Sequence, residues 1–171
     1  LFNLLETNYK LLLDEKFRYG AVPVRVINLA ITEMISELAP NLWEKNLKRC
    51  VDFGHIFSPV IEMNNTQSLL HGEAVALDCI FSSIIAFNRK YIDRDKLNRF
   101  IQLAKNLELP IYEESFNNIE LIKESLADAT KHRNGNQFAP LPIDIGNYRI
   151  VNDIKNSELI NALEVFSQLK E

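Results

Sequence analysis

Glycine is scarce in this chain: five of its 171 residues are glycines, and they are scattered. The sequence therefore has no glycine-rich loop to cradle phosphates and no dinucleotide-binding fingerprint of its own. Cysteine is scarcer still, because Cys50 and Cys79 are the only two. They are too few and too isolated for a disulfide framework or a cysteine zinc site. We expect two buried, reduced thiols in a cytoplasmic protein.

Other absences exclude further classes of protein. No apolar run approaches the roughly 18 residues that span a bilayer, so we expect no membrane partner. The net charge is −4, and the lysines and arginines form no basic stripe, which argues against a nucleic-acid partner. The first residues, Leu1 to Glu6, lack the basic region of a secretory signal. Because the chain begins with Leu, we expect a piece of a longer protein, with residues 1–171 forming one domain.

The apolar residues follow a helical period over most of the chain, which predicts a mainly α fold. One stripe predicts a core-facing helix that Pro40 ends; its members are Ile27, Ala30, Ile31, Met34, Ile35 and Leu38. Further stripes predict helices over 97–107, 119–129 and 159–166. Asp93 or Asp95 is a candidate N-cap for the first of these three helices and Ser157 for the last.

Two segments depart from this amphipathic pattern. Residues 74–87 are apolar nearly all round, which is typical of a buried central helix. Residues 138–151 carry two prolines and a glycine between short apolar runs, and Tyr148 to Val151 has strand-like content. We expect a loop with a small hairpin there.

Two of the three histidines stand at predicted helix starts. His55 precedes Ser58-Pro59, a helix-start signal in which the serine can cap, and His71 opens the buried helix. Imidazole is the commonest metal ligand, and a catalytic zinc takes three protein ligands. Two histidines cannot complete such a site alone. On spacing alone, hydrogen-bonded structural histidines are the more common interpretation.

A longer motif surrounds these histidines. The run Asp52-Phe53-Gly54-His55, followed by Phe57-Ser58-Pro59 and Glu62 and then by His71-Gly72-Glu73-Ala74-Val75, resembles the sugar phosphate cyclases, the superfamily of 3-dehydroquinate synthase. The resemblance covers the C-terminal helical domain. It implies that His55 and His71 bind zinc or cobalt, with a glutamate upstream of Leu1 as the third ligand. It also implies that NAD is bound mainly by an N-terminal domain absent from this chain, and that the full-length enzyme is a homodimer.

Departures within the motif separate the members of this superfamily. Dehydroquinate synthases usually have Asn at Asp52, His at Pro59 and Lys at His132. The residues here look like those of 2-epi-5-epi-valiolone synthases, which convert sedoheptulose 7-phosphate to a C7 cyclitol. The desmethyl-4-deoxygadusol synthases share Ser-Pro but typically have Ala at Asp52 and Thr at His132. Ile56 stands where the superfamily usually has Ser or Thr.

The resemblance also implies roles for the neighbouring polar residues. Asp52 would hydrogen-bond substrate hydroxyls, and His132 would contact phosphate or shuttle a proton. Arg49 and Arg133 are candidate phosphate or hydroxyl clamps, with Lys48 as the alternative to Arg49. For Asp52 and His132, the alternative is an ordinary loop residue.

The implied activity is that of a lyase acting on a small-molecule sugar phosphate. Bound NAD would transiently take a hydride, phosphate would be eliminated, the hydride would return, and an aldol step would close the ring. Dehydroquinate synthase and desmethyl-4-deoxygadusol synthase remain enzyme alternatives. A non-catalytic helical interaction remnant is an alternative of another class. We expect the 171 residues alone to be inactive and to bind zinc weakly.

Overall fold

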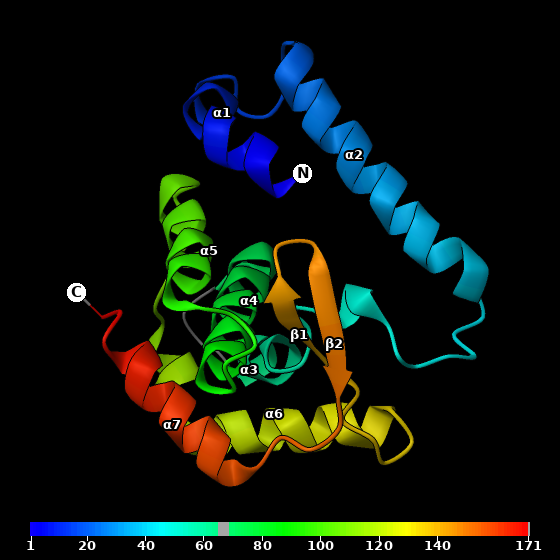
Figure 1. Ribbon diagram of the computed structural model, residues 1–171, viewed down its shortest axis with the longest axis vertical. Coiled ribbons are helices and arrows are strands. Elements are labelled where there is room, and N and C mark those ends of the chain that lie inside the picture. Colours follow the sequence, from blue (N-terminus) through cyan, green and yellow to red (C-terminus); the bar gives the residue numbers. More distant parts are fainter. Residues whose placement is uncertain (65–68, 171) are drawn as a thin grey trace.

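The computed structural model describes residues 1–64 and 69–170 and shows the predicted mainly helical fold with a small two-stranded sheet (Figure 1). Its helices are α1 (Phe2–Asp14), α2 (Ala21–Leu38), α3 (Ser58–Asn64), α4 (His71–Asn88), α5 (Arg94–Asn106), α6 (Ile119–His132) and α7 (Asn156–Ser167). Short 3-10 turns are η1 (Ala39–Asn41), η2 (Cys50–Asp52) and η3 (Glu114–Asn117). In the part of the chain that the structure describes, no helix is long and apolar enough to cross a membrane.

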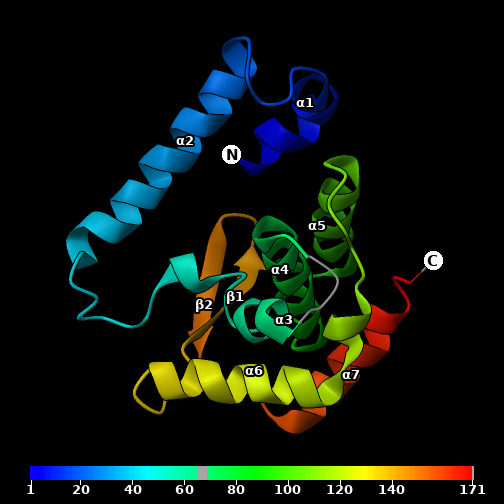
Figure 2. The same cartoon turned by 180° about the vertical axis from the view of Figure 1, so that it is seen from behind.

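Helix α4 is the centre of the fold, as its apolar sequence predicts. Helices α3, α5 and α7 and the hairpin pack around it (Figures 1 and 2). Its residues Leu77, Phe81 and Ile84 are fully buried. The Phe81 ring makes edge contacts with Phe57, which precedes α3, and with Phe166 of α7. A rigid central helix therefore carries His71 at its first residue.

The hairpin expected within 138–151 is confirmed. Strands β1 (Ala139–Asp144) and β2 (Asn147–Val151) pair antiparallel, with Ala139 opposite Val151. Gly146 supplies the positive φ of the turn, +82°. Strand β1 packs against α4, so the hairpin covers one side of the central helix.

The expectation that the stripe on α2 faces the core is wrong. The helix ends at Leu38, before Pro40, as predicted, but all six residues of its apolar stripe are exposed. Ile31 and Ile35 are 53% and 58% exposed. Helix α2 runs along one side of the molecule and packs mainly against α1, η1 and η2 (Figure 1). Helical periodicity predicts a face suited to burial, but it does not supply the partner that covers it.

The predicted N-caps have mixed outcomes. Asp93 caps α5, since its carboxylate accepts the Lys96 N–H over 2.8 Å. Ser157 does not cap α7, because the helix begins one residue earlier. There Glu158 accepts the N–H of the N-cap residue Lys155. A carboxylate in the first turn has replaced the serine hydroxyl as the capping group.

Candidate functional site

The loop that carries His55 lies directly on helix α4, and Gly54 makes this possible. Gly54 has φ +85°. A Cβ built there would stand 2.8 Å from both Cys79 Sγ and Val75 Cγ1 of α4, closer than such atoms approach. A side chain at this position would push the loop off the helix. Gly54 therefore determines how closely the loop of His55 packs against α4.

The two histidines of the motif converge. The ring centroids of His55 and His71 are 5.5 Å apart, with the ring planes inclined by 52°. His55 is half-buried at the end of its loop, whereas the side chain of His71 is 65% exposed at the start of α4. Rings this close can turn nitrogens toward one shared ion without a change of fold.

Glu62 of α3 fixes the orientation of His71. Its Oε2 lies 2.9 Å from His71 Nδ1. A histidine that donates Nδ1–H to a carboxylate keeps Nε2 as the nitrogen for a metal, an arrangement common around zinc. His55 Nδ1 lies 3.4 Å from the Phe53 carbonyl oxygen, which favours the same tautomer. The two side chains thus fit two positions of a zinc site.

Among the described residues, no third protein ligand lies near them. Within residues 1–64 and 69–170, no three His, Cys, Asp or Glu side chains are grouped so that they could hold a metal. Both cysteines are free. Burial and the neighbouring Glu37 raise the pKa of Cys50 to about 11, and burial also raises the pKa of Cys79. Neither thiol is therefore poised as a thiolate ligand.

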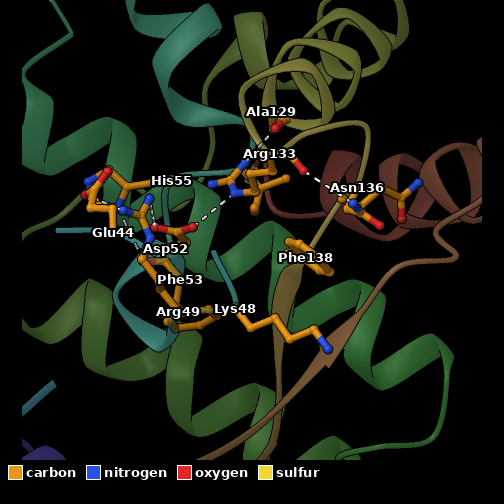
Figure 3. A network of polar contacts seen from close by, with 12 residues as sticks. Glu44, Lys48, Arg49, Asp52, Phe53, His55, Ala129, Arg133, Asn136 and Phe138 are labelled. Carbon is orange, nitrogen blue, oxygen red and sulfur yellow. Dashed lines mark hydrogen bonds and ion pairs between the residues drawn. The ribbon is translucent and has the colours of Figure 1, made fainter. Parts of the chain in front are cut away.

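Asp52 joins the two arginines predicted from the sequence (Figure 3). Its side chain is 6% exposed and forms ion pairs with Arg49 Nη2 at 2.9 Å and Arg133 Nε at 3.0 Å. Arg133 follows the last residue of α6 and also donates from Nη1 to the Ala129 carbonyl oxygen. The structure thus brings Asp52, Arg49 and Arg133 together from η2 and the end of α6.

The cations around Asp52 differ in how they are engaged. Arg49 also pairs with Glu44, and its buried Nε has no hydrogen-bond partner among the described residues. Lys48 makes no ion pair within the described part of the chain, and its Nζ lies 5.5 Å from the Phe138 ring centroid (Figure 3). Lys48 is therefore the more available cation of the two neighbours.

His132 takes no part in this cluster. Its side chain is 73% exposed, and Nε2 lies 3.5 Å from Asp128 Oδ1 one turn earlier on α6. It precedes Arg133 directly, so the end of α6 presents one buried cation and one exposed imidazole. A weak contact of this kind leaves His132 accessible to a ligand.

Asp78, the buried carboxylate of α4, has a role that was not predicted from the sequence. Asp78 Oδ2 accepts the backbone N–H groups of Ile56, Phe57 and Ser58 at 2.9, 2.6 and 2.9 Å. Burial raises the pKa of Asp78, although these N–H donors oppose the shift. An acidic residue inside an otherwise apolar helix was the available signal, since a buried carboxylate needs partners.

The prediction that Ser58 caps α3 with its hydroxyl is wrong. Ser58 is the first residue of α3, and its hydroxyl donates to the Gly54 carbonyl oxygen at 2.6 Å. Asp78 instead accepts the N–H of Ser58, the first residue of α3. The side chain of Ile56, at the position where Ser or Thr is usual, is 2% exposed and belongs to the main core. Ile56 therefore takes part in the hydrogen bonds around the site only through its backbone N–H, which donates to Asp78.

The comparisons with known proteins agree with the motif. Residues 1–132 match the family described as 3-dehydroquinate synthase C-terminal. The chain is 39% identical to the 2-epi-5-epi-valiolone synthase of Actinoplanes sp., over 100% of this chain and 44% of that protein. It is 31% identical to the 3-dehydroquinate synthase of Caldanaerobacter subterraneus, over 71% of this chain and 34% of that protein.

A solved structure shows the same likeness. The 2-epi-5-epi-valiolone synthase ValA of Streptomyces hygroscopicus, with NAD+ and Zn2+ bound, superposes with a TM-score of 0.93 at 39% identity. The match covers 98% of this chain and 46% of that one. The chain therefore spans less than half the length of the relatives it matches.

Proposed function

Because the chain belongs to the 3-dehydroquinate synthase C-terminal family, we propose that it is the metal- and substrate-binding helical domain of a sugar phosphate cyclase of the 2-epi-5-epi-valiolone synthase type. The substrate would be sedoheptulose 7-phosphate and the product a C7 cyclitol, with elimination of phosphate. The convergence of His55 and His71, with Glu62 behind His71, is the observation that carries the proposal.

The two histidines would hold zinc, as the Zn2+ in the solved relative suggests, and cobalt is the alternative ion. When bound, the ion would act as a Lewis acid on substrate oxygens. Its third ligand and the NAD site would come from an N-terminal domain outside the 171 residues. The cofactor would supply the redox chemistry, and the residues of this chain would bind and orient the sugar.

Asp52 is suited to bind substrate hydroxyl groups. An ionised carboxylate has about four acceptor positions, and Arg49 and Arg133 occupy two of them. The remaining positions would accept hydrogen bonds from hydroxyls, while the two guanidinium groups hold the carboxylate in place. Arg133 would thereby act mainly through Asp52.

A phosphate group needs a cation that is not already neutralised. Arg49 is paired with two carboxylates, whereas Lys48 has no ion pair among the described residues. The contacts therefore favour Lys48 over Arg49 as the clamp. His132 is exposed and would contact phosphate or shuttle a proton.

The alternatives are less well supported. A dehydroquinate synthase would usually carry other residues at Asp52, Pro59 and His132, and the identity to the dehydroquinate relative is lower, 31% against 39%. A non-catalytic remnant would have no need of the His71–Glu62 contact, because the His71 side chain is 65% exposed and such a surface contact adds little stability. We further propose that the full-length protein is a cytoplasmic homodimer.

Phosphate release from the full-length protein tests the proposal. With NAD and zinc supplied, we expect turnover of sedoheptulose 7-phosphate and none of the dehydroquinate precursor. Turnover of the precursor alone would overturn the assignment. The variant His71→Ala should abolish turnover of either substrate, which links the activity to this chain.

The isolated 171-residue chain provides a second test. With two of three ligands it should bind zinc only weakly, and release no phosphate from either sugar. Titration calorimetry with zinc measures this directly. A sub-micromolar dissociation constant would contradict the proposed division of the site between two domains.

A further inference from the structure

Helix α4 positions both histidines, although only His71 belongs to it. His71 is its first residue, and Asp78 stands about two turns further along the same helix. Asp78 is fully buried. Through its three backbone hydrogen bonds it binds the segment that begins directly after His55.

These hydrogen bonds provide an acceptor for backbone N–H groups at and just before the start of α3. The first N–H groups of a helix have no partner within the helix and carry partial positive charge. Three consecutive N–H groups, from Ile56 to Ser58, point to one carboxylate oxygen, Asp78 Oδ2. The other oxygen accepts the Ser82 hydroxyl at 3.0 Å, so both carboxylate oxygens are engaged.

The same contacts restrain His55. Its own N–H donates to the Asp52 carbonyl oxygen at 2.9 Å, and the next N–H along the chain, that of Ile56, donates to Asp78. The backbone of His55 is therefore held on both sides. Gly54 lies against Val75 and Cys79 of α4, which fixes the approach of the loop.

We propose that Asp78 is a positioning residue of the metal site, which places the loop of His55 on the helix that carries His71 and so sets the spacing of the two rings. This inference rests on the proposed function, because it assumes that the two histidines share an ion. Because Asp78 is fully buried and both its oxygens are engaged, it would not touch the metal or the substrate. Its effect is transmitted through the backbone of residues 56–58.

Substitution of Asp78 should weaken metal binding by more than a loss of stability explains. Partners that orient metal ligands typically contribute a factor of about 10 to 100 in affinity. In Asp78→Asn, an isosteric change, one amide oxygen can still accept N–H groups but without the charge, so we expect a loss of about 10-fold. Asp78→Leu removes every acceptor, so its loss should approach 100-fold.

The matched control is Ser83→Ala. Ser83 is also buried on α4, but its hydroxyl donates to the Cys79 carbonyl oxygen and does not contact the loop of His55. We expect this variant to keep the zinc affinity of the unmodified protein. If both variants lose thermal stability but only Asp78→Asn loses zinc affinity, the weaker zinc binding is not a consequence of lower stability.

Two measurements on the full-length protein test the inference. Zinc affinity is measured by competition with a chelator, and hydrogen exchange of the peptide covering residues 54–58 is measured by mass spectrometry in the metal-free protein. In Asp78→Asn we expect weaker zinc binding and faster exchange in this peptide, with neither change in Ser83→Ala. Unchanged exchange, or unchanged zinc affinity despite faster exchange, would overturn the inference.

Failure of the proposed function gives a different result. If His55→Ala and His71→Ala leave zinc affinity at its original value, the histidines do not form the metal site, and the inference falls with the proposal. If those variants lose zinc while Asp78→Asn and Asp78→Leu retain it, the proposed function stands and the role of Asp78 alone is wrong.

Discussion

Arg133 and Asp52 lie 81 positions apart in the sequence, yet Arg133 Nε donates to Asp52 Oδ2 over 3.0 Å with both side chains less than a tenth exposed. The pair joins the end of α6 to η2, three residues before His55. It is a buried charge pair beside the candidate metal site, so it contributes both to stability and to the arrangement of the proposed substrate-binding groups.

Removing one partner of this pair should destabilise the fold. Asp52→Ala leaves Arg133 buried without its carboxylate, and the expected loss in free energy of unfolding is about 3 kcal/mol. Urea denaturation measures it. Asp128→Ala is the control, because Asp128 makes only a 3.5 Å contact with exposed His132 and should change stability by less than about 0.5 kcal/mol. Equal effects of the two substitutions would contradict the buried pair.

Two glycines of the motif should respond oppositely to the same substitution. Gly54→Ala introduces a Cβ against Cys79 and Val75 at a positive φ, and should cost about 2 to 3 kcal/mol. Gly72 lies in α4 with nothing within 4 Å of the added Cβ, so Gly72→Ala should be neutral or stabilise by up to about 1 kcal/mol. Thermal melts of both variants compare them. A destabilised Gly72→Ala would show that α4 begins differently.

The exposed stripe of α2 predicts that large-to-small changes there are tolerated in the 171-residue chain. Ile31 is 53% exposed and Ile84 is fully buried. Ile31→Ala should therefore change the free energy of unfolding by less than about 0.5 kcal/mol, whereas Ile84→Ala should lower it by about 2 to 5 kcal/mol. A loss above about 2 kcal/mol for Ile31→Ala would mean that α2 is covered within this chain.

The ion pair between Arg89 and Glu158 should make the stability of the protein depend on pH. The hydrogen bond from Arg89 lowers the pKa of Glu158, whose side chain is 24% exposed. A carboxyl with a lowered folded-state pKa adds stability above its unfolded pKa, and this is lost as pH falls through the folded value. Glu158→Gln should cost about 1 kcal/mol at pH 7. The cost should shrink below about pH 4, and a cost that stays constant in urea melts from pH 7 to pH 3 would contradict the ion pair.

Local sequence was sufficient to predict much of the fold and the position of the histidine pair. The hairpin, the buried central helix and the N-cap Asp93 follow from turn residues, apolar content and capping preferences over short stretches. The two histidines were located by a motif whose residues all lie within one stretch of the chain. Their roles as metal ligands stay predictions that the zinc titrations test.

What the sequence could not supply is the choice of partner. The stripe on α2 was assigned to the core because its period suits burial, but no element of this chain covers it among the described residues. The Asp52–Arg133 pair could not be chosen from spacing, since many opposite charges are available at such separations. For Ser58 and Ser157, a hydroxyl at a helix start was the expected cap, but the carboxylates of Asp78 and Glu158 accept the N–H groups.

The two parts of the candidate site are encoded over very different lengths of chain. His55 and His71 are sixteen residues apart, and both are positioned by α4. Asp52 and Arg133, by contrast, are separated in the sequence by α4, α5 and α6. Closing a short loop costs less entropy than closing a long one, so bringing the two histidines together costs less chain entropy than bringing Asp52 to Arg133. Under the roles proposed for these residues, mutations near the end of α6 would alter the sugar-binding groups and leave the metal-binding histidines unchanged.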